Sequence, residues 1–210
     1  MRKTTRPEAA ARPHLAHLDL DRALVEAARA DPARFDALYR KYVAHVYTFA
    51  VYELRDHHDA EDATARTFLA ALAGLPRFRE RARPEDGEGA STFRIWLFRI
   101  ARNVINERRR MGRRRPEAAL DPELDAAAPD DLEAAVVRRE TAETAWRAVG
   151  RLRGDRRRAV VLRFVNELST PEIGAILGRS DGAVRVLIHR GLRAVARDLL
   201  RSGDGHEGRA

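Results

Sequence analysis

The sequence predicts an all-α protein in which two small helical domains, residues 19–115 and 137–201, are joined by an acidic linker at 116–136. The second domain is expected to contain a helix-turn-helix. Three observations predict this architecture. Apolar residues recur at three- and four-residue steps without strand-type alternation. Basic and acidic residues are segregated into blocks, and near the carboxyl end a capping box precedes a glycine and a second capped segment.

Composition limits the classes of function. The 210 residues carry 40 basic and 32 acidic side chains, a formal net charge of +8, so a polyanion such as nucleic acid is the expected partner. The absence of cysteine excludes disulfides, thiolate zinc sites and cysteine nucleophiles. No run approaches the ~18 apolar residues of a membrane-spanning helix, and the amino-terminal residues show no apolar stretch typical of a secretory signal. We therefore expect a cytoplasmic protein without membrane insertion.

The first domain opens with two expected helices. Asp31 followed by Pro32 is typical of a helix start. The apolar side chains after it share one helix face: Phe35, Leu38, Tyr39, Tyr42, Val46, Phe49 and Ala50. A second helix is expected from His57, because the carboxylates in its first turns suit the positive end of the helix dipole.

The start of that second helix allows a metal site as an alternative. The residues with suitable ligand chemistry are His45, His58, Asp59, Glu61 and Asp62. Adjacent residues on a helix point in different directions, so an acidic contact surface for a basic partner is the simpler interpretation. No metal and no cofactor are expected.

Residues 92–110 predict a helix with an inward and an outward stripe. The inward residues are Phe93, Trp96, Leu97, Ile100 and Val104. The outward residues fall at i, i+4, i+7 and i+11, which places them on one solvent face: Arg99, Asn103, Asn106 and Arg110. Amides can bond base edges and arginines neutralise phosphates, so this stripe predicts nucleic-acid binding, with an ordinary polar face as the alternative. The preceding segment 80–90, with a proline and two glycines, predicts a loop.

The linker separates this basic helix from a second basic domain. Residues 102–115 hold seven arginines and one acid, whereas residues 116–137 hold seven acids and no base. Its prolines and alanines are typical of a connector. Helices expected at 136–149 and 156–165 then lead into the helix-turn-helix.

The helix-turn-helix is predicted from its caps and its glycines. Ser169 and Glu172 form a capping box, Gly178 stops the first helix, Ser180 caps the second, and Gly174 lets the two cross closely. The second helix would lie in the DNA major groove. Its outward residues are Asp181, Arg185, Val186, His189 and Arg190, of which the last four are the candidate DNA contacts.

Four stretches together resemble the extracytoplasmic-function type of bacterial RNA polymerase sigma factor. They occur in the family's order and cover most of residues 33–201: FDALYRKYVAHVYTFA (35–50), DAEDATARTFLAAL (59–72), STFRIWLFRIARNVINERRR (91–110) and VVLRFVNELSTPEIGAILGRSDGAVRVLIHRGLRAV (160–195). The resemblance implies that 19–115 is a region 2-like domain and 137–201 a region 4-like domain.

The resemblance also implies a function, which is promoter specificity for RNA polymerase and not catalysis. The 92–110 helix would recognise the minus-ten element and promote DNA opening, with Asn103 near a flipped-out base. The helix-turn-helix would recognise the minus-thirty-five element. The stretch 35–72 would dock on polymerase, through Asp59, Glu61, Asp62, Thr67 and Phe68.

The implied partners are core RNA polymerase, contacted at the beta-prime clamp helices and the beta flap, promoter DNA, and an anti-sigma factor as a regulator. Two other functions stay open from the residues alone. One is a helix-turn-helix regulator that binds duplex DNA without polymerase, which leaves 35–72 unexplained. The other is an HD-like metal phosphohydrolase that uses His45, His58 and Asp59.

Overall fold

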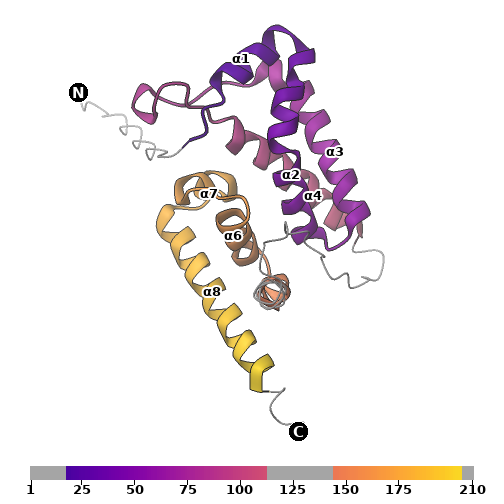
Figure 1. Cartoon of the computed structure of the whole chain (residues 1–210), viewed down its shortest axis with the longest axis vertical. Helices are drawn as coiled ribbons and strands as arrows, with labels where there is room; N and C mark the ends of the chain where they lie inside the picture. Colours follow the sequence, from indigo (N-terminus) through magenta and orange to yellow (C-terminus); the bar gives the residue numbers. More distant parts are fainter. Residues whose placement is uncertain (1–17, 113–143, 205–210) are drawn as a thin grey trace, which may run out of the picture.

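The computed structural model describes residues 18–112 and 144–204, and the regular elements in these ranges are all helical, as predicted (Figure 1). The first range contains α1 (Arg22–Ala30), α2 (Phe35–Leu54), α3 (His57–Gly74) and α4 (Phe93–Gly112). The second contains a helical segment at 144–151, then α6 (Asp155–Phe164), α7 (Thr170–Leu177) and α8 (Asp181–Asp204). Within these ranges no helix combines the length and the apolar character needed to cross a membrane. The linker expected at 116–136, and most of the helix expected at 136–149, lie outside the described residues.

Helices α2, α3 and α4 lie side by side (Figure 1), and aromatic side chains form much of the core between them. The Phe49 and Phe98 rings lie 5.6 Å apart, and the Phe93 ring lies 5.9 Å from that of Tyr42. The apolar face predicted for α2 is confirmed, because six of its seven side chains are buried and only Tyr39 is exposed. These contacts fix α4 against the rest of the first unit.

Two aspartates cap the starts of the segments that form α2 and α3. Asp31 accepts a hydrogen bond from the Ala33 N–H at 3.0 Å and begins a short 3-10 turn, Pro32–Arg34, that runs into α2. Asp56 accepts from the Asp59 N–H at 2.7 Å and caps α3. Each cap satisfies an amide that the helix itself leaves without an acceptor.

The predicted loop before α4 is ordered by one carboxylate. Glu80 accepts hydrogen bonds from three backbone N–H groups and from the hydroxyls of Ser91 and Thr92. Burial alone would raise the pKa of Glu80, but these hydrogen bonds hold its pKa below the ordinary value. The Arg22 N–H donates to the Gly89 carbonyl at 3.1 Å and ties the far end of the loop to α1. The start of α4 is therefore held in a defined position.

Helix α4 is buried on more sides than its sequence predicts. The inward stripe is right at its start, where Phe93 and Leu97 are fully buried. Three members of the stripe are only half-buried: Trp96, Ile100 and Val104. Four residues outside the stripe are buried instead: Ile95, Phe98, Ala101 and Ile105. The reason is that α4 packs against α2 and α3 and also against α7, so no single stripe separates core from solvent.

Helices α7 and α8 form the predicted helix-turn-helix. The Ser169 N–H donates to Glu172 Oε2 at 2.8 Å, and the reciprocal bond of the capping box is also present. Gly178 ends α7 in the left-handed conformation, with φ of 69°. The Ser180 hydroxyl accepts from an amide in the first turn of α8. A Cβ at Gly174 would lie 2.8 Å from a carbonyl oxygen of the turn, which explains the glycine at this position.

A second close approach joins α8 to α6. A Cβ at Gly191 would lie 2.7 Å from Val160 Cγ2 and 3.5 Å from Leu152 Cδ1, and both of these side chains are buried. Gly182, in the first turn of the same helix, has no atom within 4 Å of its Cβ position. The two glycines therefore differ in packing but share one helix.

We expect Gly191→Ala to lower the free energy of unfolding by about 1–3 kcal/mol, because the added methyl overpacks the α6–α8 contact. Gly182→Ala is the matched control and is expected to be neutral or stabilising by up to ~1 kcal/mol, because alanine has the higher helix propensity. Urea unfolding followed by circular dichroism measures both. Equal stabilities of the two variants would contradict the packing argument.

Candidate nucleic-acid interface

The outward stripe of α4 is in part covered by the second unit. Asn103 and Arg110 are exposed, as predicted. Asn106 is half-buried, because Arg158 Nη2 donates to its side-chain oxygen at 2.5 Å. Arg99 keeps its exposure but donates through Nε and Nη2 to the Ala175 carbonyl of α7, at 2.8 and 2.5 Å. The expected solvent face is therefore correct for Asn103 and Arg110. Asn106 contacts α6 and Arg99 contacts α7 instead.

Four of the five predicted outward residues of α8 lie on a free surface, whereas Asp181 is half-buried. Arg185, Val186, His189 and Arg190 are all exposed. Within residues 18–112 and 144–201 none of the four makes a hydrogen bond or an ion pair to another side chain. They occupy the first turns of the second helix of a helix-turn-helix, which is the part that reaches base edges in the major groove. Their exposure agrees with the outward side that the sequence predicted, and their contact with DNA stays a prediction.

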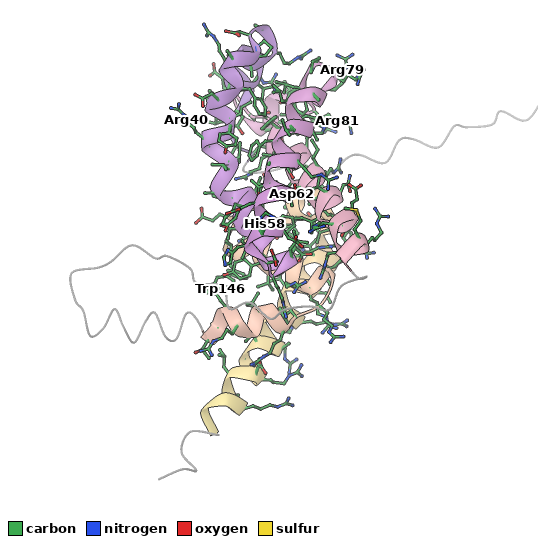
Figure 2. All side chains as sticks on the ribbon, turned by 90° about the vertical axis from the view of Figure 1, so that its right-hand side faces the viewer. Arg40, His58, Asp62, Arg79, Arg81 and Trp146 are labelled. Carbon is green, nitrogen blue, oxygen red and sulfur yellow. The ribbon has the colours of Figure 1, made fainter. Side chains whose placement is uncertain are left out.

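Basic side chains gather where the loop meets α4. Arg79 and Arg81 are exposed, and Figure 2 shows them at one end of the first unit. Arg99 is exposed in part, and the partial burial of its guanidinium group lowers its pKa, as do the neighbouring charges of Arg81 and Arg102. Several guanidinium groups thus share one region of positive potential, which suits a polyanion.

The acidic start of α3 is a separate surface. Glu61 and Asp62 are exposed, and Figure 2 shows Asp62 and His58 nearer to the second unit than Arg79 and Arg81 are. Asp59 is half-buried and forms a charge-assisted hydrogen bond with Arg108 of α4. Two of the three predicted carboxylates therefore stand free for a basic partner.

Thr67 and Phe68, which the resemblance implied as polymerase contacts, are buried inside the first unit. The Thr67 hydroxyl donates to the Ala63 carbonyl at 2.6 Å. The Phe68 ring packs edge-on against Tyr39, with centroids 4.9 Å apart. Neither side chain reaches the surface in this conformation. The exposed apolar residues beside them are Tyr39, Leu69 and Leu72, which sequence reasoning did not select.

One of the five side chains of the metal alternative is paired with another side chain, whereas Glu61 and Asp62 stay exposed. Asp59 pairs with Arg108, and His57 Nδ1 shares a hydrogen bond with the Tyr47 hydroxyl at 2.8 Å. The described part of the chain contains no group of three or more histidine and carboxylate side chains that could hold a metal ion. This geometry offers the metal phosphohydrolase reading no support.

Sequence reasoning missed a buried ionic cluster between the two units. Glu53, at the carboxyl end of α2, is 2% exposed and lies 3.0 Å from Arg109 of α4. Arg157 and Arg158 of α6 approach the same carboxylate at 3.3 and 2.9 Å. Burial lowers the pKa of Arg157, and Glu53 opposes that shift. Glu53 is a single acidic residue after an apolar stretch, and nothing in the neighbouring sequence indicates that it pairs with arginines of the second unit.

A second polar contact joins α4 to α7. Arg94 pairs with Glu172 at 2.7 Å and with Asp19 at 3.2 Å. Burial alone would lower the pKa of Arg94, but the two carboxylates hold its pKa above the ordinary value. Arg102 Nη1 donates to the Ile176 carbonyl at 2.9 Å. With the Arg99 bonds, these contacts seat α7 directly on α4.

Comparison with known proteins adds independent findings. Residues 38–115 match the family profile described as Sigma-70 region 2, and residues 142–195 match Sigma-70, region 4. The RNA polymerase sigma factor CarQ of Myxococcus xanthus is 35% identical over 170 residues, which are 79% of this chain and 88% of CarQ. The RNA polymerase sigma-H factor of Pseudomonas aeruginosa is 32% identical over 189 residues, 85% of this chain and 93% of that protein.

The ECF RNA polymerase sigma factor BldN of Streptomyces coelicolor is 33% identical over 181 residues, 84% of this chain, but the chain spans only 64% of BldN. Among solved structures, CnrH in complex with the cytosolic domain of CnrY has a TM-score of 0.60 at 26% identity, covering 88% of this chain and 99% of CnrH. The sigma factor RpoE of Bartonella quintana, in complex with the anti-sigma factor NepR, shares the fold, with a TM-score of 0.59 at 20% identity over 79% of this chain and 96% of RpoE.

Two sigma-70 regions in order, an all-helical fold shared with solved sigma factors, and relatives above 30% identity over most of both chains agree with one another. The chain therefore belongs to the extracytoplasmic-function RNA polymerase sigma factors, which recognise promoters for RNA polymerase.

Proposed function

We propose that this sigma factor recognises the minus-thirty-five element with α8 and the minus-ten element with α4. The observation that carries the proposal is the exposed, unpaired set Arg185, Val186, His189 and Arg190 on the first turns of α8. Arginine can bond guanine in the major groove or clamp a phosphate, and valine can contact a thymine methyl. The free surface of α8 supports an assignment that sequence alone gave as an expectation.

The minus-ten assignment rests on the polar stripe of α4 and the basic side chains beside it. Asn103 is exposed between two turns that carry Arg99 and Arg110. An exposed amide suits the edge of an unpaired base, and the arginines suit the phosphates of the separated strand. Extruding a base costs a few kcal/mol, which binding of the single strand can offset, so opening would need no nucleotide hydrolysis by this chain.

The polymerase-binding assignment is narrower than the sequence suggested. Exposed Glu61 and Asp62 would contact basic residues of the beta-prime clamp helices, and exposed Leu69 and Leu72 lie further along the same helix. Buried Thr67 and Phe68 would act only by supporting this surface from inside. The second unit would contact the beta flap, and the acidic 116–136 segment would follow a positively charged polymerase channel.

Regulation by an anti-sigma factor is part of the proposal. RpoE of Bartonella quintana was solved with the anti-sigma factor NepR, and the present chain shares its fold. Because promoter DNA and polymerase are cytoplasmic in bacteria, we infer that this chain acts in the cytoplasm.

Transcription in a purified system tests the whole function. Core RNA polymerase is incubated with source genomic DNA, with and without the chain, and the 5′ ends of the transcripts are sequenced. The proposal requires a set of start sites that appear only with the chain and share two motifs about one and a half helical turns apart. Tight duplex binding without any polymerase-dependent start sites would instead identify a regulator that works alone.

Asn103→Ala is expected to reduce promoter opening about tenfold, because one amide–base contact is worth ~1–3 kcal/mol. Permanganate reactivity of the opened strand measures the extent of opening, on a promoter identified by the transcription experiment. Arg40→Ala, on the exposed outer side of α2, is the control and should leave opening unchanged (Figure 2). Full opening by Asn103→Ala would remove this residue from the DNA site.

Arg185→Ala is expected to weaken discrimination at the minus-thirty-five motif by ~1–3 kcal/mol, because a bidentate base contact is lost. The measurement compares transcription from the cognate promoter with transcription from single-base variants of that motif. Arg193→Ala, an exposed arginine further along α8, removes the same charge and should keep wild-type discrimination. Unchanged discrimination in Arg185→Ala would contradict the base-reading role.

Asp62→Arg is expected to weaken the complex with core polymerase at least tenfold, because the new charge repels the basic partner that the exposed carboxylate would attract. Fluorescence anisotropy of the labelled chain, titrated with core enzyme, measures the affinity. Glu26→Arg on α1 makes the same charge change on a distant exposed site. Equal affinities for the two variants would place the docking surface elsewhere.

A further inference from the structure

The DNA-facing side of α4 is occupied by the chain itself. We propose that the arrangement described above is a self-inhibited state, in which α6 and α7 cover this side of α4 and the buried carboxylate of Glu53 holds them there. Polymerase and DNA would then act on a chain that must first open. This inference rests on the proposed function of α4.

The end of α7 provides acceptors that stand in for phosphate oxygens. The carbonyls of Ala175 and Ile176 belong to the last turn of α7, where backbone oxygens have no partner within the helix and carry the negative end of its dipole. Arg99 and Arg102 of α4 donate to these two oxygens. The guanidinium groups that DNA phosphates would bind are thus already bound.

The amide side of the stripe is engaged as well. The Asn106 side-chain oxygen accepts from Arg158, which also donates to Glu53 Oε2 at 2.9 Å. One residue of α6 therefore links the proposed DNA surface to the buried carboxylate. Asn103 and Arg110 stay exposed, so the closed state leaves only part of the stripe available to a strand.

The closed arrangement also cannot serve both promoter elements at once. Ala175 contacts α4, and α8 begins six residues later at Asp181, a distance of at most ~22 Å of extended chain. Two motifs one and a half turns apart lie roughly 50 Å from each other at ~34 Å per turn. Reading both motifs requires α7 to leave α4, and the 116–136 segment is long enough, at up to ~70 Å extended, to permit it.

The contact is suited to opening. Ion pairs and hydrogen bonds contribute to it alongside apolar packing, because one hydrophobic cluster spans both units and the Tyr52 and Trp146 rings lie 5.1 Å apart. Polar interfaces between domains resemble those of transient complexes. A phosphate carries a full charge where a helix end carries about half of one, so bound DNA can outcompete α7 for the same arginines.

The test uses Glu53→Gln in the full chain. This change keeps the side-chain volume but removes the carboxylate that pairs with Arg157 and leaves Arg158 with only Asp155, at 3.6 Å, in the closed state. Water solvates all of these groups once the units separate. Because the chain has no cysteine, Arg40→Cys and Arg193→Cys in both backgrounds place two dyes at exposed sites on different units. Energy transfer between the dyes reports the closed fraction without DNA.

The second readout is affinity for a fluorescein-labelled (dT)20 strand. An apparent dissociation constant rises as the competent fraction falls, so we expect Glu53→Gln to lower energy transfer and to bind (dT)20 about tenfold more tightly than the wild type. Glu26→Gln on α1 makes the same charge change at an exposed site and should stay within about twofold of the wild type in both readouts.

A second variant covers the case in which Glu53→Gln loses helical circular dichroism. Asn166→Ala removes one bond across the same contact, from Asn166 Nδ2 to the His45 carbonyl at 2.9 Å. It should lower energy transfer and tighten (dT)20 binding about two- to fivefold.

Unchanged energy transfer in the folded variant overturns the self-inhibited state. Reduced transfer with unchanged (dT)20 affinity also overturns it, since it would mean that opening exposes no DNA surface on α4. Failure of the proposed function would give a different result, which is the absence of chain-dependent start sites with core polymerase. The wild-type chain alone is enough to detect it.

Discussion

One buried carboxylate determines how the two units of this sigma factor meet. A carboxylate taken out of water is strongly unfavourable unless its charge is paired and hydrogen-bonded, and Glu53 additionally lies at the carboxyl end of α2, where the helix dipole repels an anion. Arg109 offsets this from within the first unit, and Arg157 and Arg158 complete the pairing from the second. Without Arg157 and Arg158 the buried Glu53 keeps only Arg109 as a charged partner, and without Glu53 the buried Arg157 has no carboxylate partner among the described residues. Each side of the contact therefore depends on the other.

The hydrogen-bonding chemistry of arginine explains why one surface can be both a DNA site and an internal contact. A guanidinium presents several fixed donors and binds any array of suitably spaced oxygens. In the closed chain those oxygens are helix-end carbonyls and carboxylates, on α7 and around Glu53. On a promoter they would be phosphates. Arginine side chains can therefore serve either purpose, and the structure places several of them in the contact between the units.

Local chemistry made the helix-turn-helix predictable. The capping box, the Gly178 stop and the outward face of α8 all follow from residues within one or two turns of each other. The second buried face of α4 was not predictable in this way, because it is created by α7, whose residues lie more than seventy positions away in the sequence. Periodicity predicts which face of a helix is apolar, but it does not predict that another element will cover the polar face. Phe68 could not be placed correctly from sequence either. The resemblance implied that it contacts polymerase, whereas the packing of the first unit buries its ring.

Glu172 shows how the second unit can leave α4 and remain folded. Its two oxygens have separate tasks: Oε2 accepts from the Ser169 amide and hydroxyl and caps α7, while Oε1 accepts from Arg94 of the other unit. When the units separate, only the Oε1 bond is exchanged for water, and the capping box still stabilises the first helix of the helix-turn-helix. Glu53 has no such division, because Oε2 accepts from Arg109 of its own unit and from Arg158 of the other. The main cost in free energy of separating the units therefore arises at Glu53, and the second unit stays folded when it leaves α4.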